Sequence, residues 1–351
     1  MQSTASIPVA RVVPLLRLLL LPIALLAALL AGTLVGAVDI SPAETVRILL
    51  FKLGLYAGHI TWSSGDQAIV WSLRLPRVIA AALVGAALGV AGALFQAVLR
   101  NPLADPYVIG TAAGAQVGVV AGVLLPLQFL VLGFGPMQVL AFVGALGTVV
   151  FVYSLARVGG RTPIVTLLLA GFVVSSFLIS STTALAYLSG RINQVLTWTM
   201  GGLDVSAWGQ LATAAPVILG SITLAYLASS QLDVLLLGEE QAQHLGVRVE
   251  RLKLAAIVLA SLLTALAVTL AGVVAFVGLI VPHAARLIYG PHHRILIPAS
   301  AALGAVFLIL ADLVAHLVLS PTILPLGVVT AIIGAPFFLH LLRRSRRDYG
   351  I

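Results

Sequence analysis

Few side chains in this sequence are placed to do covalent or redox chemistry. The 351 residues include no cysteine, which excludes disulfides, thiolate metal sites and cysteine nucleophiles. The seven histidines are scattered, and no two of them form a ligand pair on one predicted helix face. No GxxxxGK(S/T) phosphate loop, HExxH motif or nucleophile elbow occurs in the chain. We therefore expect no catalytic residue, no metal site and no resident cofactor.

One carboxylate, Asp312, lies within a long apolar run, 295–318. Acidic residues inside a membrane are costly, and they usually face the interior of a helix bundle. Such a group can relay protons in a secondary transporter, or it can form a structural hydrogen bond to a neighbouring helix. Asp312 is the lone acid of its run, and this favours the structural role.

A pair of arginines, Arg74 and Arg77, precedes the apolar run that starts at residue 78. A guanidinium presents a planar fork of donors that matches a carboxylate. If this end of the run lies outside the membrane, both arginines can receive acidic groups of an external partner protein. The alternatives are contacts with lipid phosphates and local salt bridges within the chain.

Polar residues and two prolines follow the same run in the segment Asn101-Pro102-Leu103-Ala104-Asp105-Pro106. Pro102 and Pro106 disfavour a helix that continues through them, so the segment is predicted to be a turn. Its polar content, next to the glycine-rich stretch 110–118, favours a pathway-lining role over that of a plain helix-breaking loop.

A second polar segment, 232–249, is the longest one predicted on the cytoplasmic side. Within it, a short helix is predicted from Gly238 to Leu245. The acidic pair at its start, Glu239 and Glu240, suits the positive end of a helix dipole. The next glycine along the chain, Gly246, can adopt the left-handed conformation that ends many helices.

Two apolar residues of this short helix, Ala242 and Leu245, are three positions apart and are predicted to share one face. The chain has no phosphate loop of its own, so any energy from ATP hydrolysis must reach it through a surface contact with another protein. The shared face could enter a groove on a partner subunit. The alternative is a solvated loop helix without a partner.

The composition indicates which elements must position these residues. Hydrophobic side chains make up 61% of the chain and charged side chains only 9%, whereas soluble domains carry about 25% charged residues. Lipid is therefore the expected solvent, and we predict an all-α integral membrane protein with a single domain over residues 1–351. Its apolar runs indicate about ten transmembrane helices. The predicted spans are 15–38, 78–99, 107–127, 137–156, 163–188, 210–230, 252–272, 274–289, 295–318 and 325–342.

Basic residues indicate the orientation of these spans. With the N-terminus in the cytoplasm, most of the 19 basic residues fall on the cytoplasmic side. The exceptions are Arg47, Lys52, Arg74, Arg77 and Arg191. The bias predicts that both termini are cytoplasmic, and it accounts for the net charge of +8 without nucleic-acid binding.

Two segments near the N-terminus complete this layout. The apolar run from Leu18 to Val38 is longer than the apolar part of a usual signal peptide, so we interpret it as the first membrane helix. Residues 41–56 are too short and too charged to span, and they are predicted to form an external surface helix. Ser41 is its expected N-cap, with proline at the first helical position and Glu44 in the first turn.

Six stretches, taken in order, closely resemble the FecCD-type permeases of ABC importers for iron–siderophore complexes, haem and vitamin B12. They are RLPRVIAAALVGAALGVAGALFQAVLRNPLADPYVIGTAAGA (74–115), LLLAGFVVSS (167–176), WTMGG (198–202), LGEEQAQHLGV (237–247), GVVAFVGLIVPHAARLIYGPHHR (272–294) and PLGVVTAIIGAPFFLHLL (325–342). They extend over nearly the whole chain, and the first and fifth are the most specific.

This resemblance implies the fold of a type II ABC importer permease with ten helices per subunit. It implies a homodimer with its transport path along the two-fold axis, two ATPase subunits on the cytoplasmic side and a substrate-binding protein outside. The segment 240–246 resembles the E-A-A-x-x-x-G loop of importer permeases, with Gln241 in place of the middle alanine, and is implied to couple the permease to the ATPase. The resemblance also implies a cytoplasmic gate formed by Asn101, Leu103, Ile164 and Val165.

The expected function is that of the transmembrane permease subunit of a binding-protein-dependent ABC importer. The protein would lie in the bacterial inner membrane, and separate ATPase subunits would hydrolyse ATP. An iron–siderophore complex is the leading substrate, and haem and cobalamin are close alternatives. The rival from another class is a proton-driven secondary transporter.

Overall fold

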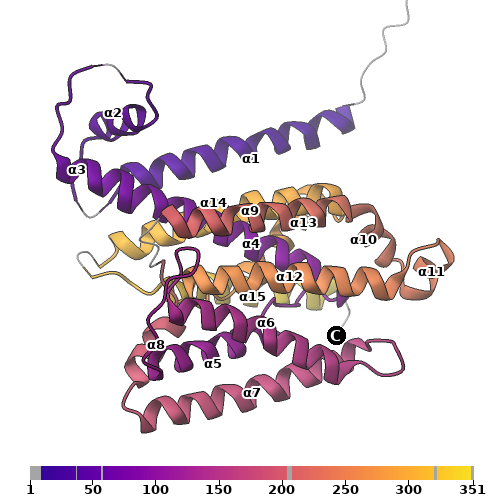
Figure 1. The fold of residues 1–351 in the computed structure, drawn as a ribbon. Coiled ribbons are helices and arrows are strands. Elements are labelled where there is room, and N and C mark those ends of the chain that lie inside the picture. Colours follow the sequence, from indigo (N-terminus) through magenta and orange to yellow (C-terminus); the bar gives the residue numbers. More distant parts are fainter. Residues whose placement is uncertain (1–8, 37, 57, 204–207, 320–321, 349–351) are drawn as a thin grey trace, which may run out of the picture.

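The computed structural model describes residues 9–36, 38–56, 58–203, 208–319 and 322–348, whose regular structure is helical apart from two isolated β-bridges. The prediction of an all-α chain is therefore confirmed for the described residues (Figure 1). The elements are α1 (Val9–Leu34), α2 (Pro42–Lys52), α3 (Ser64–Ala68), the π-helical segment η1 (Ile69–Arg74), α4 (Leu75–Val98), α5 (Thr111–Leu124), α6 (Pro136–Ala156), α7 (Ile164–Leu188), α8 (Ile192–Thr199), α9 (Trp208–Leu227), α10 (Ser229–Leu235), α11 (Glu239–His244), α12 (Val249–Ala271), α13 (Val277–Tyr289), α14 (His293–Leu317) and α15 (Leu326–Asp348).

The number of helices that can cross a membrane is lower than the sequence predicts. By length and composition, six helical segments of the described chain qualify: Ser64–Val98, Pro136–Ala156, Ile164–Leu188, Trp208–Leu227, Val249–Ala271 and His293–Leu317. Shorter apolar helical stretches are Leu20–Leu34, Thr111–Leu124, Val277–Tyr289 and Leu326–Leu339. Each of the ten predicted spans overlaps a helix, but by this measure ten transmembrane helices is too high a number. Residue 37 of the first predicted span lies outside the described residues.

Irregular backbone shortens two of these helices where the hydropathy of the sequence is continuous. Helix α5 has 14 residues and α13 has 13, so each rises only about 20 Å, less than the about 30 Å of a bilayer core. The proline-containing turn delays the start of α5 until Thr111. Before α13 the chain is unwound between Gly272 and Phe276, and both of these residues have positive φ, 63° and 68°.

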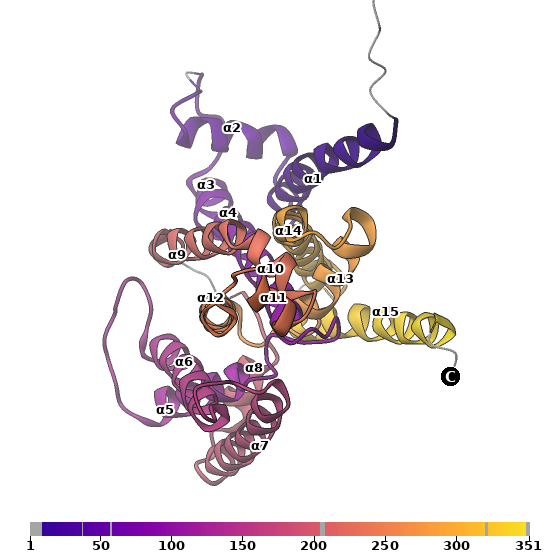
Figure 2. The same cartoon turned by 90° about the vertical axis from the view of Figure 1, so that its right-hand side faces the viewer.

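Helix α4 runs through the centre of the bundle and packs against α12, α13 and α14 (Figures 1 and 2). Its glycines let the backbones approach closely, as small residues do where helices pack in membranes. A Cβ added at Gly85 would collide with the carbonyl oxygen of Gly304, and one at Gly92 would collide with that of Gly278. The glycine-rich face of α4 is therefore a packing surface.

The predicted surface helix is present as α2, which lies beside the bundle near η1 and α3 (Figures 1 and 2). Ser41 is its N-cap, because the Ser41 hydroxyl oxygen accepts a hydrogen bond of 3.2 Å from the Glu44 N–H. The helix buries Ile48 against Trp62 and Val70 in a small cluster separate from the main core. This contact attaches α2 to the start of the long helical segment 64–98.

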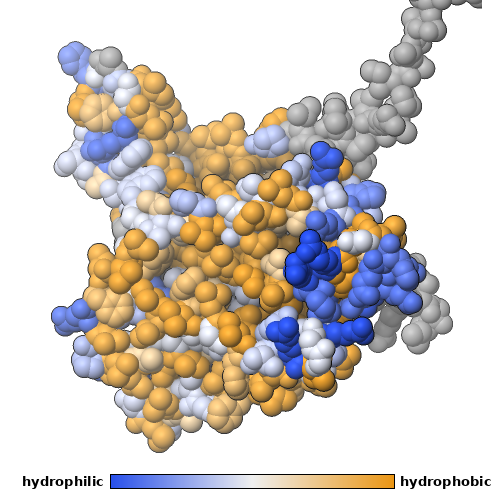
Figure 3. Space-filling model, turned by 45° about the vertical axis from the view of Figure 1, so that its right-hand side comes forward, coloured by the Kyte–Doolittle hydropathy of each residue, from blue (hydrophilic) through white to orange (hydrophobic). Residues whose placement is uncertain are grey.

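Apolar side chains dominate the face of the molecule shown in Figure 3. Helix α7 is the least buried of the six long segments, with 11% of its most apolar window buried. Large side chains such as Phe172 and Phe177 are about two-thirds exposed, at 70% and 67%. Lipid or another subunit must cover such a face.

The first turn of α1, the end of α15 and helix α11 lie at one end of the bundle, and α2, α3 and α8 lie at the other (Figure 1). The described ends of the chain thus share one side with the predicted coupling segment. The arginines Arg74 and Arg77, on η1 and α4, lie near the opposite end.

Candidate functional site

Arg77 and Asp312 form an ion pair between α4 and α14. The Arg77 Nη2 lies 3.0 Å from Asp312 Oδ1 and the Nε lies 3.1 Å from Oδ2, so the guanidinium fork meets the carboxylate with two bonds. The two side chains are 23% and 9% exposed. This geometry supports the structural role of Asp312 over that of a proton relay, because its charge is already compensated within the chain.

Arg74 lies one turn before Arg77, in the π-helical segment η1. Its guanidinium donates hydrogen bonds to the backbone carbonyl oxygens of Leu34, the last residue of α1, and of Val38 in the chain that follows. Both predicted docking arginines therefore contact their own chain. The fork of Arg77 is occupied by a carboxylate, whereas the hydrogen-bond acceptors of Arg74 are neutral carbonyls and the Asp39 carboxylate interacts with it only electrostatically.

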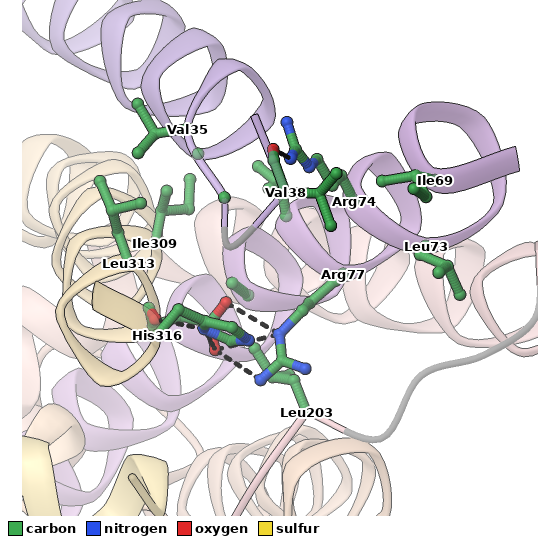
Figure 4. Close-up of a pocket in the computed structure, with 15 residues that line it drawn as sticks. Val35, Val38, Ile69, Leu73, Arg74, Arg77, Leu203, Ile309, Leu313 and His316 are labelled. Carbon is green, nitrogen blue, oxygen red and sulfur yellow. Dashed lines mark hydrogen bonds and ion pairs between the residues drawn. The ribbon is translucent and has the colours of Figure 1, made fainter. Parts of the chain in front are cut away.

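A pocket of about 560 Å³ brings these two arginines together (Figure 4). Apolar side chains of α1, η1, α4 and α14 form most of its wall, with Leu203 contributing from the chain that follows α8. His316 joins the polar part of the lining, and its Nδ1 donates to the backbone oxygen of Asp312 at 2.7 Å. The polar groups gathered here are Arg74, Arg77, Asp312 and His316.

At the other end of α4, the predicted gate residues Asn101 and Leu103 lie in an exposed turn. The Asn101 side-chain oxygen accepts the Leu103 N–H at 2.9 Å, which stabilises the turn without a helix. Tyr107 then fixes the end of the segment, because its hydroxyl bonds to the backbone of Val274 at 3.2 Å. The predicted turn between the two prolines is thus present and anchored to the chain before α13.

Asp105, in the same turn, is half-buried and accepts the Tyr107 N–H at 2.8 Å. Burial raises the pKa of the Asp105 carboxyl to about 6 from its ordinary value of 3.8, and the Tyr107 N–H acts in the opposite direction. Because the folded-state pKa is raised, the carboxyl favours folding most below pH 3.8, and this contribution is lost as the pH rises towards about 6.

We expect Asp105→Asn, which keeps the acceptor oxygen, to raise the melting temperature of the purified protein by about 4 °C at a pH well above 6. The gain should shrink as the pH falls through about 6 and vanish below pH 3.8, where the wild-type carboxyl is neutral in both the folded and the unfolded protein. Thermal unfolding of both proteins across this range measures it. A gain that is the same at every pH would contradict the role of the ionised carboxylate.

The other two predicted gate residues, Ile164 and Val165, form the first turn of α7. Ile164 is half-buried against the main core, whereas Val165 is 68% exposed. Pro163 precedes them as the N-cap residue, with extended backbone. The structure therefore places these residues at the start of a helix whose outer face is uncovered.

The predicted coupling helix is present as α11, which runs from Glu239 to His244, with Gly238 and Leu245 as its caps. Gly246 follows with a φ of 84°, the left-handed conformation that its position predicts. Two acidic residues occupy the first turn, as expected for a helix N-terminus. The local structure of this segment is confirmed.

The expected common surface of Ala242 and Leu245 is wrong. Ala242 is fully buried in the main core, whereas Leu245 is 64% exposed. Positions three apart differ by about 60° around a helix axis, and α11 leans against the bundle along the side that carries Ala242. Of this pair, only Leu245 is free to touch a partner.

Sequence reasoning missed a group of charged residues around α11. Glu239 lies 3.3 Å from the Lys253 ammonium and 3.8 Å from Arg100, and Glu250 lies 2.8 Å from Lys253. The sequence does carry one signal, because Glu250 and Lys253 are three positions apart at the start of an apolar helix. By hydropathy alone, Lys253 counts only as one of the basic residues expected on the cytoplasmic side.

Comparison with known proteins identifies the family of this chain. The model of the FecCD transport family matches residues 23–344. The cobalamin import system permease protein BtuC of Halobacterium salinarum is 47% identical over 280 residues, which cover 79% of this chain and 74% of that protein. The Fe(3+)-citrate import system permease protein YfmD of Bacillus subtilis is 40% identical over 315 residues, which cover 89% of this chain and 90% of that protein.

A solved structure has the same fold. It is described as an inward-facing conformation of a metal-chelate type ABC transporter, and it superimposes with a TM-score of 0.78 at 27% sequence identity, covering 93% of this chain and 98% of that one. The family match extends over all six long helical segments, the turn after α4 and helix α11. The chain is therefore a multi-pass membrane permease that belongs to the FecCD transport family.

Proposed function

We propose that this chain is the membrane-spanning permease subunit of a binding-protein-dependent ABC importer for a metal chelate. Helix α11 carries the proposal: it is a capped helix at the end of the bundle, with Leu245 exposed beside a buried anchor, Ala242. Such a helix is suited to receive force from another subunit. ATP is hydrolysed by two separate ATPase subunits, and this chain supplies the path.

The proposed assembly is a homodimer of the permease in the bacterial inner membrane. The uncovered apolar face of α7 supports a second copy or lipid beside it. The segment 232–249 and both chain termini face the cytoplasm in this proposal, and α2 and the pocket with Arg74 face the outside. A substrate-binding protein docks on that outer side.

An iron–siderophore complex is the substrate that we propose first, and a relative that imports Fe(3+)-citrate supports it. Cobalamin is the second candidate, and the 47% identity to a cobalamin permease favours it. Haem belongs to the same class of large chelates. What these molecules share is a metal ion enclosed in an organic ligand, and that class is the core of the proposal.

Uptake into proteoliposomes tests the function. The permease is reconstituted with its ATPase and binding protein, and uptake of a labelled ferric siderophore, hemin and cobalamin is measured with and without ATP. We expect ATP-dependent uptake of one of the three that persists when a protonophore collapses the proton gradient. Uptake that needs no ATPase but is lost with the gradient would identify a proton-driven secondary transporter instead.

For the outer surface, we expect Arg74→Glu to slow docking of the binding protein about tenfold at low salt, because charges at the rim of an interface mainly set the association rate. Arg74 tests docking more directly than Arg77, because a glutamate at position 77 would repel Asp312 and so also affect stability. Surface plasmon resonance on the purified complex measures the rate. Arg47→Glu, an exposed charge reversal on α2, is the matched control. Equal rates for wild type and Arg74→Glu would remove Arg74 from the docking surface.

For the gate, we expect cysteines introduced at Asn101, Leu103 or Val165 to cross-link between the two permease subunits, to an extent that depends on bound nucleotide. The chain contains no other cysteine, so each product has one origin. All three residues are exposed. A cysteine at Leu130, exposed in the loop between α5 and α6, serves as the control that should not respond to nucleotide. Absence of the inter-subunit product in every nucleotide state would leave the turn at 101–106 a purely structural one.

A further inference from the structure

The Lys253 ammonium is the centre of a charged cluster at the end of the bundle that carries α11. Its side chain is only 4% exposed. It contacts Glu250 Oε1 at 2.8 Å, Glu239 Oε1 at 3.3 Å and the backbone oxygen of Thr162 at 3.2 Å. An ammonium has three N–H donors, and here each has an acceptor from a different segment of the chain. The buried charge is thus fully satisfied.

Two contacts of the charged cluster hold the backbone that leads into α7. Lys253 binds the carbonyl oxygen of Thr162, and Glu250 Oε2 accepts the N–H of the same residue at 3.3 Å. Thr162 is 2% exposed and stands two positions before Ile164, where α7 begins. The Glu250–Lys253 pair is therefore hydrogen-bonded on both sides to the peptide unit that leads into the first turn of α7.

A third contact reaches the turn after α4. Glu239 lies 3.8 Å from Arg100, which directly precedes Asn101. Arg100 has a φ of 46°, a left-handed conformation that is costly for a residue with a side chain. Such a conformation persists only where the surroundings stabilise it, and the carboxylate of Glu239 is one such contact.

Glu239 is also the first residue of α11. One carboxylate of the coupling helix thus contacts the residue before the turn at 101–106, and through Lys253 it reaches the residue that leads into α7. Both of these segments carry predicted gate residues. The core around Ala242 also attaches α11 to the bundle.

We propose that the Glu239–Lys253–Glu250 cluster links displacement of α11 to both segments of the cytoplasmic gate, with Lys253 as the positioning residue at its centre; this rests on the proposed importer function. When the ATPase subunits move α11, the cluster carries the displacement to Thr162 and Arg100. Without the cluster, α11 still binds the ATPase, but displacement of α11 no longer moves the gate residues.

The test uses the complete complex of permease, ATPase and binding protein in proteoliposomes. Lys253→Met removes the charge at nearly constant length, and Glu239→Gln removes one carboxylate charge at a residue that is 31% exposed. We expect both variants to keep ATPase association and ATP hydrolysis. The amount of substrate transported per ATP hydrolysed should fall about tenfold, and the cross-link at a cysteine replacing Asn101 should lose its dependence on nucleotide.

Matched variants separate coupling from folding. Arg251→Gln removes an exposed positive charge two positions from Lys253, on the same helix, and should keep the wild-type ratio of transport to hydrolysis. Glu239→Asp keeps the negative charge and should restore much of the ratio lost in Glu239→Gln. A merely structural role would lower hydrolysis and transport in parallel. If Lys253→Met fails to assemble, Glu239→Gln and its aspartate rescue decide the question.

Failure of this inference differs from failure of the proposed function. Wild-type complex without ATP-dependent uptake would overturn both. ATP-dependent uptake in the wild type, together with an unchanged ratio and an unchanged nucleotide response in Glu239→Gln, would overturn the coupling cluster alone.

Discussion

Replacing Leu245 with arginine is expected to abolish co-purification of the ATPase subunits and, with it, substrate uptake. Leu245 is 64% exposed at the end of α11, while the rest of that helix is held by buried Ala242 and by the Lys253 cluster. An arginine at this position would replace an exposed apolar residue of the proposed contact with an unpaired charge. Desolvating a charge without a partner costs several kcal/mol. Affinity purification of tagged permease, followed by quantification of bound ATPase, measures the effect.

Because Leu245 contacts little of its own chain, the variant should fold and insert normally. Its elution profile and yield in detergent should therefore match the wild type. Leu53→Arg is the matched control, since Leu53 is equally exposed, at 63%, but lies beside α2 at the other end of the molecule. Full ATPase binding and full uptake by Leu245→Arg would refute α11 as the coupling contact.

Removal of either partner of the Arg77–Asp312 pair is expected to destabilise the protein strongly. Asp312→Leu leaves the Arg77 guanidinium without its carboxylate, and loss of one partner from a buried ion pair costs about 3–5 kcal/mol. The pair lies between α4 and α14, which form the central packing of the bundle. Thermal unfolding in detergent and the yield of inserted protein should both fall.

The double variant Arg77→Met with Asp312→Leu should recover most of this stability, because two apolar side chains can replace a buried ion pair at little net cost. The same double variant separates the effect of Arg77 on stability from its effect on docking of the binding protein. If Arg77 additionally receives a carboxylate of the binding protein, the recovered double variant still docks poorly. Additive losses in the two single variants and the double variant would contradict an ion pair between these residues.

Several parts of this molecule follow from local sequence signals. The Ser41 cap and the glycine end of α11 at Gly246 each depend on a few neighbouring residues. Caps and left-handed helix ends depend on hydrogen bonds between near neighbours, and the residue type largely determines whether these bonds form. The membrane character follows in the same way from composition, because a chain with 9% charged residues cannot cover a soluble surface.

Hydropathy alone did not predict which helices are long. The proline turn before α5 and the unwound stretch between Gly272 and Phe276 interrupt apolar sequence where the backbone leaves the helix. Such irregular backbone is tolerated at membrane depth because surrounding protein satisfies its polar groups, as the Tyr107 hydroxyl does for Val274. Those partners are distant in sequence, so a window of neighbouring residues does not reveal them.

The same limit applies to the coupling helix and the charged residues. Spacing showed that Ala242 and Leu245 lie near one another on a helix, but only the docking of α11 on the bundle decided that Ala242 is covered and Leu245 is not. The sequence presented Arg77 and Asp312 as two separate charges, 235 positions apart, and Lys253 as a charge with no assigned partner. Their pairing depends on how whole helices pack, and packing is decided by burial over the entire chain. The membrane character and the local helix caps could therefore be predicted from the sequence. The ion-pair partners of charged residues across the bundle were decided only by the tertiary structure.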